Sequence, residues 1–351
     1  MIASFQHSMD QKFIETDILI IGAGPVGLFA VFEAGLLKMR CHLIDVLSQP
    51  GGQLTEIYPK KPIYDIPGCP SILASDLVKN LLQQIEPFQP GFTLGERADS
   101  VEKQQDGRWK VTTDKGRVHV APVIFIAGGL GCFEPRKPPI DHIDRFEGKG
   151  VEYFIRNPED FRNQRIVIAG GGDSALDWTI YLANEVRELT LIHRRSQFRG
   201  ALDSVEKVQH LAQSGKTKLI TNAQVVGLEG DQRLSGVVVE HDTEGKISLE
   251  ADYFLPLFGL TPKLGPIAEW GLGMDSGAIT VNTLDYSTNV PGIFAIGDIN
   301  TYEGKLKLIL CGFHEATLAC QSAFNLVNPG KKLSFKYTTV TGIEGMGTPV
   351  S

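Results

Sequence analysis

Two glycine-rich turns, far apart in the chain, constrain the fold more than any other feature of this sequence. Each follows a short apolar run and precedes a stretch with helical periodicity, and a second apolar run then ends the unit. The turns are Gly22-x-Gly24-x-x-Gly27 and Gly170-x-Gly172-x-x-Ala175, and the closing runs are Cys41–Asp45 and Leu189–His193. This order of strand, turn, helix and strand is the β-α-β unit of dinucleotide-binding folds. The sequence therefore predicts two nucleotide-binding units in one chain.

The second unit is predicted to be inserted in the first. A buried strand expected over Pro122–Ala127 is followed by a Gly/Pro segment, and another such segment follows Tyr253–Gly259. The strand Ile293–Gly297 and the helix Gly312–Val327 would then complete the first domain. We therefore expect an α/β protein with two Rossmann-like, three-layer dinucleotide-binding domains. The first is formed by residues 1–130 and 262–351, with a C-terminal extension at 328–351, and the second by residues 131–261.

The first turn is suited to bind a pyrophosphate. Its glycines, between a strand and a helix, allow backbone N–H groups and the helix N-terminus to approach phosphate oxygens without obstruction by Cβ atoms. Asp45 lies 23 residues after Gly22, where a carboxylate accepts hydrogen bonds from the adenosine ribose hydroxyls. A tight turn without a ligand is the competing interpretation. The combination of strand, helix and terminal acid argues against it.

The second turn differs from the first at the end of its closing strand. His193 lies 23 residues after Gly170, so His193, Arg194 and Arg195 stand where the first unit has its acid, with Arg199 close behind. Cationic side chains can neutralise a ribose 2′-phosphate, whereas an acid would repel it. The pattern predicts NADP(H) rather than NAD(H), and a solvated basic turn is the alternative. The predicted site consists of Gly170, Gly172, Ser174, Ala175, His193, Arg194, Arg195 and Arg199.

The first unit ends its closing strand with an acid, and the second ends its closing strand with arginines. This combination in one chain indicates FAD together with NADPH. Asp298, after the apolar run that ends at Gly297, is positioned to bind the ribityl or pyrophosphate part of FAD. An ordinary aspartate at a strand-to-turn junction is the alternative. The helix expected from about Cys311 would direct its N-terminus at the flavin C2 carbonyl, where negative charge gathers on reduction.

Composition limits the other partners. The chain of 351 residues has 41 acidic and 34 basic side chains and a formal charge of -7, which disfavours nucleic acid. No stretch reaches the roughly 20 apolar residues of a membrane helix, and we expect no membrane association and a cytoplasmic location. The five cysteines have no CxxC spacing, so neither a disulfide framework nor a metal site is expected. They are Cys41, Cys69, Cys132, Cys311 and Cys320.

Taken together, these segments resemble the low-molecular-weight, thioredoxin-reductase-like flavoproteins over nearly the whole chain. The resemblance includes the first glycine turn, Pro50–Leu54, Gly171–Ala175, His193–Arg195 and Gly297-Asp298, in the expected order. Thioredoxin reductases carry a redox CxxC just before the second turn, where this chain has Phe154 and Asn157 in the dithiol positions. Neither side chain can relay electrons. The dithiol-free sequence resembles instead the thioredoxin-reductase-like ferredoxin–NADP reductases.

This second resemblance implies roles for individual residues. Its shared segments are Val26–Leu28, Tyr58–Lys61, Tyr64-Asp65, Phe133–Arg136 and Thr301–Lys305, with a C-terminal extension that carries an aromatic residue before a Thr pair. It implies that Tyr58 stacks on one face of the flavin and that Tyr337, from the neighbouring subunit of a homodimer, covers the other. A half-buried packing residue is the alternative for either tyrosine. The implied FAD contacts are Gly22, Gly24, Gly27, Asp45, Gln53, Tyr58, Ala98, Phe133, Asp298, Thr338 and Thr339.

The activity implied by the resemblance is hydride transfer between NADPH and FAD, coupled to one-electron exchange with ferredoxin or flavodoxin. Lys60, Lys61, Lys305 and Lys307 are candidates for docking an acidic ferredoxin. Two alternatives stay open. The chain could be an NADPH-dependent flavoprotein reductase of another acceptor, such as a quinone or free flavin, or an FAD-binding redox sensor without turnover.

Overall fold

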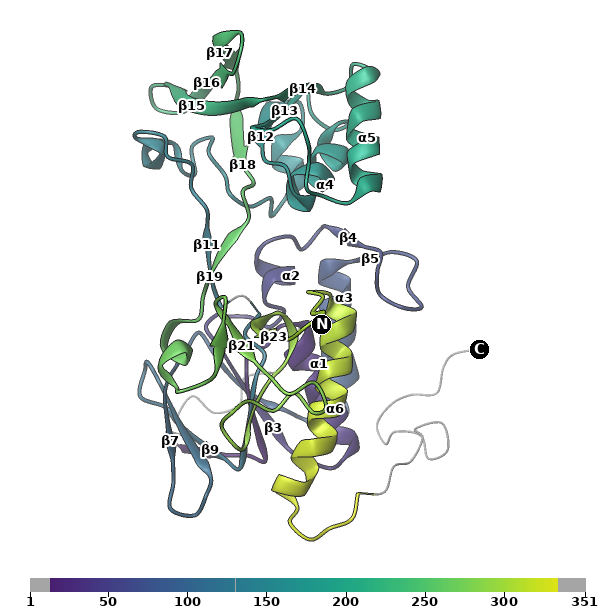
Figure 1. The fold of residues 1–351 in the computed structure, drawn as a ribbon, viewed down its shortest axis with the longest axis vertical. Coiled ribbons are helices and arrows are strands. Elements are labelled where there is room, and N and C mark those ends of the chain that lie inside the picture. Colours follow the sequence, from purple (N-terminus) through teal and green to yellow (C-terminus); the bar gives the residue numbers. More distant parts are fainter. Residues whose placement is uncertain (1–12, 130, 334–351) are drawn as a thin grey trace. The chain divides into compact units, whose positions relative to one another are not determined.

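The computed structural model describes residues 13–129 and 131–333 and divides the chain into two compact units (Figure 1). Unit 1 comprises Met1–Cys132 and Pro262–Ser351, and unit 2 comprises Phe133–Thr261. Unit 2 therefore interrupts the sequence of unit 1. The chain passes from one to the other through β11 (Cys132–Pro135) and β19 (Leu260–Lys263), which pair as a two-stranded sheet.

Five parallel strands form the central sheet of unit 1, in the order β22-β10-β2-β3-β6. β2 and β10 are apolar and buried at every position, as expected for parallel strands covered on both faces. β2 and β3 are neighbours, so their carboxyl ends bring Gly22 and Asp45 to the same edge of the sheet. The bounds are β2 Ile18–Ile21, β3 Cys41–Asp45, β6 Gly91–Leu94, β10 Val123–Ile126 and β22 Ile293–Ala295.

Helices cover one face of this sheet and a second sheet covers the other (Figure 1). Ile18 and Ile20 of β2 pack in the helical layer, whereas Leu19 and Ile21 pack with Trp109 of the second sheet. The helices are α1 Pro25–Leu36, α3 Ala74–Ile85 and α6 Ile309–Val327. The second sheet has the order β1-β9-β8-β7, with β1 Phe13–Glu15, β7 Ala98–Lys103, β8 Trp109–Thr113 and β9 Val118–Ala121.

Shorter elements complete unit 1. Residues 50–70 are rich in Pro, Gly and Tyr, which predicts an ordered loop, but this segment contains α2 and the first strand of a hairpin, β4-β5. The short elements are α2 Gln53–Glu56, β4 Pro62–Ile63, β5 Ile72–Leu73, β20 Met274–Asp275, β21 Ala278–Thr280 and β23 Asn300–Thr301, with 3₁₀ turns η1 Glu86–Phe88, η4 Gly265–Glu269 and η5 Gly297–Ile299.

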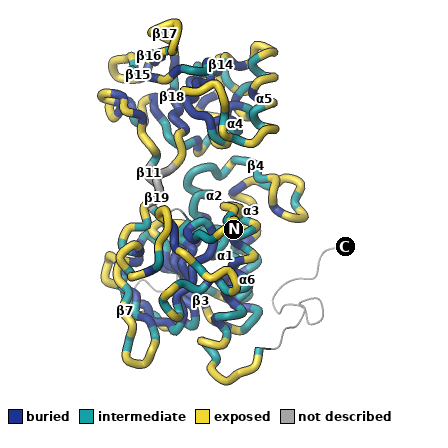
Figure 2. The backbone as a smooth tube through the Cα atoms, in the orientation of Figure 1, coloured by how far each residue is buried: buried dark blue, intermediate teal, exposed yellow. Residues whose placement is uncertain are grey.

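Unit 2 repeats the three-layer plan on a smaller scale. Its parallel sheet has the order β14-β13-β12-β18, and Val167 and Ala169 of β12 pack against the antiparallel sheet β15-β16-β17. Figure 2 shows the central strands of each unit as the most buried part of the backbone. The bounds are β12 Arg165–Ala169, β13 Glu188–His193, β14 Lys218–Thr221, β15 Ala223–Gly230, β16 Leu234–His241, β17 Gly245–Glu250, β18 Tyr253–Pro256, α4 Asp173–Leu182 and α5 Leu202–Gln213, with η2 Ile143–Phe146 and η3 Pro158–Phe161. The predicted fold class, with two Rossmann-like units, is confirmed.

Across the described ranges, no helix is both long enough and apolar enough to span a bilayer.

A buried pair of histidines joins three strands of unit 1. His42 of β3 and His119 of β9 each lie within hydrogen-bond distance of the Thr93 hydroxyl of β6, at 2.8 and 3.0 Å from their Nε2 atoms. His42 is 8% exposed and His119 is fully buried. Burial lowers the pKa of His42 to about 3 and that of His119 to about 4, and the nearby Arg117 charge acts in the same direction. Both rings are therefore neutral in the folded protein at neutral pH.

We expect acid to destabilise unit 1 through this pair. Both folded pKa values lie below the value of about 6.5 for an unfolded histidine, so from pH 6.5 down towards 4 the unfolded chain takes up protons that the folded chain does not. The free energy of unfolding should fall over this range by up to about 1.4 kcal/mol per pH unit for each histidine, and the contribution is fully present above pH 6.5.

Urea unfolding at pH 7.5 and 5.0 measures this effect. The double variant His42→Gln/His119→Gln should show a smaller difference between the two pH values than the parent. His210→Gln, at an exposed position of α5, is the matched control and should leave the difference unchanged. An equal pH dependence in the double variant and the parent would contradict the assignment.

Candidate dinucleotide-binding sites

The first glycine turn needs glycine for three different physical reasons. Gly22 has a φ of 109°, in the region that favours glycine, and a Cβ there would lie 2.4 Å from the Ala127 carbonyl oxygen. A Cβ at Gly27 would lie 2.0 Å from the Gly22 carbonyl oxygen, so this glycine permits close packing of α1 on the turn. At Gly24, the N-cap of α1, a Cβ would meet no protein atom within 4 Å. This open position lies next to a helix N-terminus, the place that can receive a phosphate group.

Asp45 lies beside this turn, at the end of β3. Its carboxylate accepts hydrogen bonds from the N–H groups of Ala23, at 2.6 Å, and Leu47, at 2.9 Å. Burial raises the pKa of the Asp45 carboxyl, while these backbone hydrogen bonds oppose the rise. The carboxylate is thus held in a fixed orientation at the turn and remains half-buried.

The segment that begins at Pro50 packs directly on the glycine turn. Gly51 donates a hydrogen bond of 2.8 Å to the Ala23 carbonyl, and a Cβ at Gly52 would lie 3.2 Å from Gly24 Cα. Gln53 begins α2 and directs its amide towards Gly129, since a Cβ at Gly129 would lie 3.6 Å from Gln53 Nε2. The structure therefore brings Gln53 to the same edge of the central sheet as the turn and Asp45.

Asp298 and the start of α6 reach the same region from the end of the chain. A Cβ at Gly297 would lie 3.3 Å from Val26 of α1, and a Cβ at Gly312 of α6 would lie 2.4 Å from the same side chain. Burial raises the pKa of Tyr58 to about 12, and the Asp298 charge acts in the same direction. Burial raises the pKa of the Asp298 carboxyl as well. The helix predicted from about Cys311 begins at Ile309.

The other predicted FAD contacts are described to different extents. Ala98 is buried at the start of β7, two residues after Glu96, whose N–H donates a hydrogen bond of 3.1 Å to the Asp45 carbonyl. Phe133 lies in β11, and its position is described for the backbone only. Tyr337, Thr338 and Thr339 lie outside the described residues.

The second glycine turn uses its glycines in a related way. A Cβ at Gly170 would lie 2.6 Å from the Ala175 Cβ, so the alanine that replaces the third glycine of the motif is accommodated by Gly170. Ala175 is fully buried in α4. Gly172 is the N-cap of α4, and a Cβ there would meet no protein atom within 4 Å, as at Gly24. Ser174 is exposed in the first turn of the same helix. The start of α4 is therefore open at Gly172, as the start of α1 is at Gly24.

The buried His193 ring packs against Gly171 of the second glycine turn. A Cβ at Gly171 would lie 2.0 Å from the His193 ring, which stacks on Phe198 with ring centroids 4.8 Å apart. Its Nε2 lies 3.0 Å from the Gln197 carbonyl oxygen and must donate, since a carbonyl only accepts. Burial lowers the pKa of His193. Burial thus disfavours the charged form of the ring, and the place of His193 in the NADPH site stays a prediction.

Three arginines remain as the cationic groups at this end of β13. Arg194, Arg195 and Arg199 are exposed, and the Arg199 N–H bonds the Gly171 carbonyl at 2.8 Å. The Asp173 carboxylate accepts a hydrogen bond of 2.7 Å from the Ala201 N–H, which fastens the arginine loop to the start of α4. Over residues 13–129 and 131–333, none of the three guanidinium groups forms an ion pair. They are available to an anionic ligand bound at the turn.

In the segment before β12, the two positions that hold the redox cysteines of thioredoxin reductases are occupied by side chains without redox chemistry. Phe154 and Asn157 are half-buried, and the Asn157 amide donates a hydrogen bond of 2.7 Å to Asp160. The thiols of Cys41 and Cys320 are buried and have raised pKa values because of burial. Among the described residues, no group of three His, Cys, Asp or Glu side chains is arranged to hold a metal ion.

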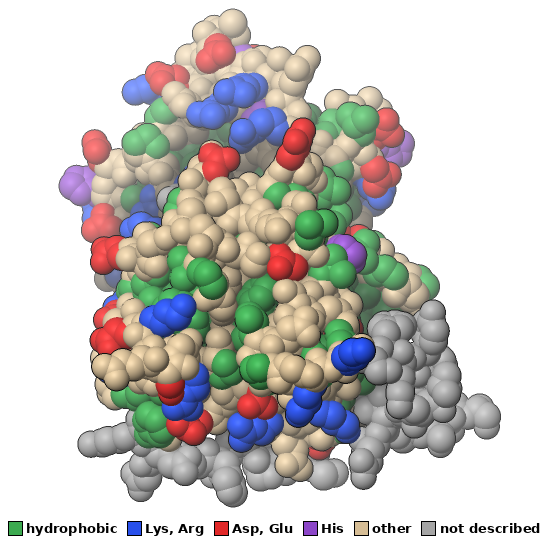
Figure 3. Space-filling view, turned by 60° about the horizontal axis from the view of Figure 1, so that its bottom comes forward, with side chains coloured by type: hydrophobic (Ala, Val, Ile, Leu, Met, Phe, Trp, Pro, Cys, Tyr) green, Lys and Arg blue, Asp and Glu red, His purple; other side chains and the backbone are tan. Residues whose placement is uncertain are grey.

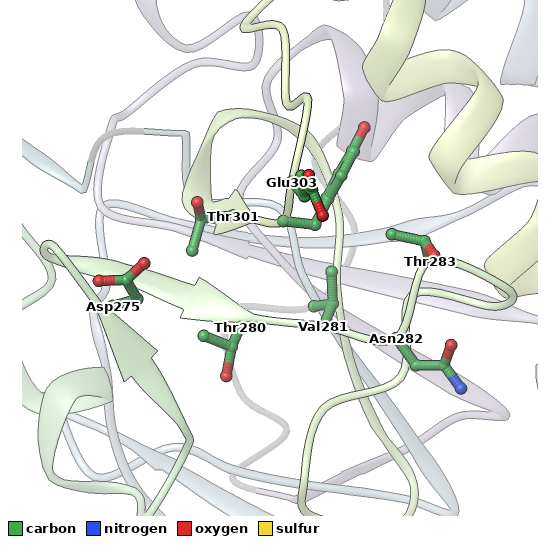
Figure 4. Close-up of a pocket in the computed structure, with 8 residues that line it drawn as sticks. Asp275, Thr280, Val281, Asn282, Thr283, Thr301 and Glu303 are labelled. Carbon is green, nitrogen blue, oxygen red and sulfur yellow. The ribbon is translucent and has the colours of Figure 1, made fainter.

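Unit 1 also contains a polar pocket away from the glycine turn. Its volume is about 610 Å³, and none of the predicted cofactor-binding residues lines it. In Figure 4, residues 280–283 continue along one segment from β21, and Thr301 and Glu303 lie on the segment across from it. The lining consists of Asp275, Thr280, Val281, Asn282, Thr283, Thr301, Tyr302 and Glu303.

Lys305, a candidate for docking ferredoxin, has a buried side chain in the structure. The Lys305 side chain is 6% exposed and forms an ion pair with Glu315, which is fully buried in α6. Lys305 therefore cannot contact a protein partner at the surface. Sequence reasoning misses Glu315 altogether, because an acidic residue inside an amphipathic helix resembles an ordinary surface residue.

Comparison with known proteins agrees with this geometry. The sequence profile described as pyridine nucleotide-disulphide oxidoreductase matches residues 16–320. A Flavobacterium johnsoniae protein named ferredoxin–NADP reductase is 66% identical over 333 residues, 95% of each chain, and a Mesorhizobium japonicum protein of the same name is 54% identical over 93% of this chain and 95% of its own. The solved thioredoxin reductase of Lactococcus lactis, in its FR conformation, superposes with a TM-score of 0.76 at 25% identity, covering 89% of this chain and 99% of that one. This chain therefore belongs to the pyridine nucleotide-disulphide oxidoreductase family.

Proposed function

We propose that this protein is an FAD-dependent ferredoxin–NADP reductase. The observation that carries the proposal is the combination of two complete dinucleotide turns with Phe154 and Asn157 in the dithiol positions. Such a chain can bind both cofactors but cannot pass electrons through a thiol pair. Relatives at 54% and 66% identity over nearly the full length carry the name ferredoxin–NADP reductase, which supports the same activity.

Unit 1 is the proposed FAD domain. The N-terminus of α1 and the open space over Gly24 would receive the pyrophosphate, and the Asp45 carboxylate would bind the adenosine ribose. Gln53, Tyr58, Ala98 and Asp298 would line the remainder of the cofactor, with Tyr58 against one face of the flavin. FAD, when bound, supplies the redox step, since it accepts a hydride and gives up electrons singly.

Unit 2 is the proposed NADPH domain. The N-terminus of α4 and the space over Gly172 would receive the pyrophosphate. Arg194, Arg195 and Arg199 would clamp the 2′-phosphate, because all three are exposed at the strand end where an NAD site places an acid. His193 would hold the arginine loop in place through Gln197 and Gly171.

The remaining parts of the proposal concern assembly and location. We propose a homodimer in which Tyr337, Thr338 and Thr339 of one subunit complete the flavin site, on the basis of the family resemblance. Sedimentation of the holoprotein tests the homodimer. We also propose a cytoplasmic location, which cell fractionation tests.

The proposed docking of ferredoxin depends on local clusters of a few Lys and Arg side chains. Figure 3 shows Lys and Arg side chains on the face in view in small groups, separated by acidic and apolar side chains. The chain is acidic overall, with a formal charge of -7, so a local basic group must attract an acidic ferredoxin. Lys60, Lys61 and Lys307 remain the candidates.

Electron transfer to ferredoxin should need no thiol. A variant with all five cysteines replaced by Ser or Ala, if it folds, should keep the parent rate of NADPH-dependent cytochrome c reduction in the presence of ferredoxin. The same assay without ferredoxin, and with a quinone or free flavin in its place, separates the proposed activity from another flavin reductase. Rapid turnover without ferredoxin would favour the other acceptor, and reduction of FAD without any turnover would favour a redox sensor.

A further inference from the structure

A buried carboxylate in α6 collects four hydrogen-bond donors from the segment that carries Asp298. Glu315 is fully buried. Its Oε2 accepts from the Gly297 N–H at 2.7 Å and from the Asn300 amide at 2.8 Å, and its Oε1 accepts from the Tyr302 hydroxyl at 3.0 Å and from Lys305. A buried charge with this many partners is costly to disturb.

Lys305 links Glu315 to the Gly297 carbonyl. Its ammonium group pairs with Glu315 and also donates a hydrogen bond of 3.0 Å to the Gly297 carbonyl oxygen. Gly297 is therefore held on both sides, at its N–H by Glu315 and at its C=O by Lys305. Its φ of 78° lies in the region that favours glycine, and because glycine populates other regions about as readily, these two hydrogen bonds select this conformation of the turn.

We infer that Lys305 and Glu315 are positioning residues for the flavin site, which fix the Gly297 turn and thereby aim the Asp298 carboxylate at FAD. The inference rests on the proposed FAD contact of Asp298. Neither side chain can reach solvent or substrate, because Glu315 is fully buried and the Lys305 side chain is 6% exposed. Their effect therefore passes through the backbone of the turn. Tyr302 adds a third attachment, since its hydroxyl bonds the same carboxylate.

The network also sets the charge around Asp298. The groups that face this carboxyl are Lys305 and Lys307, which lower its pKa, Glu315, which raises it, and Tyr58, whose pKa it raises in turn. Burial is the largest influence and raises the pKa. Removing the Lys305 charge should raise the pKa of Asp298 further, so the carboxylate would be protonated at a higher pH when the solution is acidified.

The test compares Lys305→Met with Lys307→Met. Lys307 is exposed and contributes a similar charge at Asp298, but among the described residues it makes no hydrogen bond to the Gly297 turn. The dissociation constant of FAD, measured by fluorescence titration of the apoprotein at pH 8, should rise about tenfold to a hundredfold for Lys305→Met and less than about twofold for Lys307→Met. Both variants should lose FAD at a higher pH than the parent as the solution is acidified.

A purely structural role predicts a different pattern. Lys305→Met would then lower the thermal midpoint of the apoprotein while the folded fraction bound FAD with the parent affinity and pH profile, and this result would overturn the inference. If Lys305→Met does not fold, Tyr302→Phe removes a single donor to Glu315. It should weaken FAD binding about threefold, and unchanged affinity would overturn the inference.

Asp298→Asn separates this inference from the proposed cofactor contact. Weaker FAD binding in Asp298→Asn with parent affinity in Lys305→Met would overturn the positioning role and leave the cofactor contact standing. The reverse result would overturn the cofactor contact of Asp298 and, with it, the inference that Lys305 and Glu315 aim this carboxylate at FAD.

Discussion

Replacing Arg194 and Arg195 together by alanine should raise the KM for NADPH about a hundredfold and leave the KM for NADH nearly unchanged. Each guanidinium would form charge-assisted hydrogen bonds with the 2′-phosphate, and such bonds contribute about 1.5–3 kcal/mol each. NADH has no 2′-phosphate and loses only weak contacts. Both arginines are exposed and form no ion pair among the described residues, so their removal should not disturb unit 2.

Steady-state kinetics with both coenzymes measure this selectivity. Arg187→Ala is the matched control, because Arg187 is exposed next to the opposite end of β13 and, within the described part of the chain, its one ion pair is with Glu188 at 3.8 Å. The control should retain the parent ratio of kcat/KM for NADPH to that for NADH. Equal losses for the two coenzymes in the double variant would show that the arginines do not recognise the phosphate.

Gly24→Val should abolish retention of FAD, and Gly172→Val should abolish use of NADPH while FAD stays bound. In both cases the new side chain would extend into a space free of protein atoms, where the pyrophosphate is proposed to lie. The backbone at both positions is extended, with φ of -72° and -104°, which valine adopts without strain. We expect each affinity to fall about a hundredfold or more, because the phosphates lose their place at the helix N-terminus.

The two valine variants serve as controls for each other. Flavin absorbance after gel filtration reports FAD retention, and rapid mixing with NADPH reports reduction of the bound flavin. Circular dichroism should show parent secondary structure in both. A Gly24→Val protein that keeps FAD at the parent ratio would place the cofactor elsewhere.

The features that could be predicted from the sequence are those that depend on residues close together in the chain. The glycine turns and the acid and arginine strand ends could be recognised because each lies within one β-α-β unit, where spacing along the chain fixes the geometry. The predicted fold class and the resemblance to the dithiol-free reductases are confirmed by the topology and by the matched relatives. The roles of individual site residues remain predictions.

The features that could not be predicted depend on contacts between distant segments. The packing of Gly171 on the His193 ring requires the fold of the arginine loop, which no periodicity reveals. The burial of Lys305 depends on Glu315 of α6, and from sequence a lysine in a Gly-rich segment is indistinguishable from a solvated one. For the same reason, the donors gathered around Glu315 become visible only when α6 is packed on α1.

The insertion of unit 2 also determines the order in which the protein can be made. A ribosome delivers all of Phe133–Thr261 before β22 emerges, so the uninterrupted unit can fold while β10 still lacks its neighbour in the sheet. Until then the incomplete sheet of unit 1 has an open edge at β10, where a strand of another chain can pair. Synthesis of β22 gives β10 its second neighbour, and synthesis of α6 then delivers Glu315 to the Gly297 turn. A chain interrupted before α6 would therefore contain all of unit 2 but a unit 1 whose Gly297 turn lacks the Glu315 carboxylate.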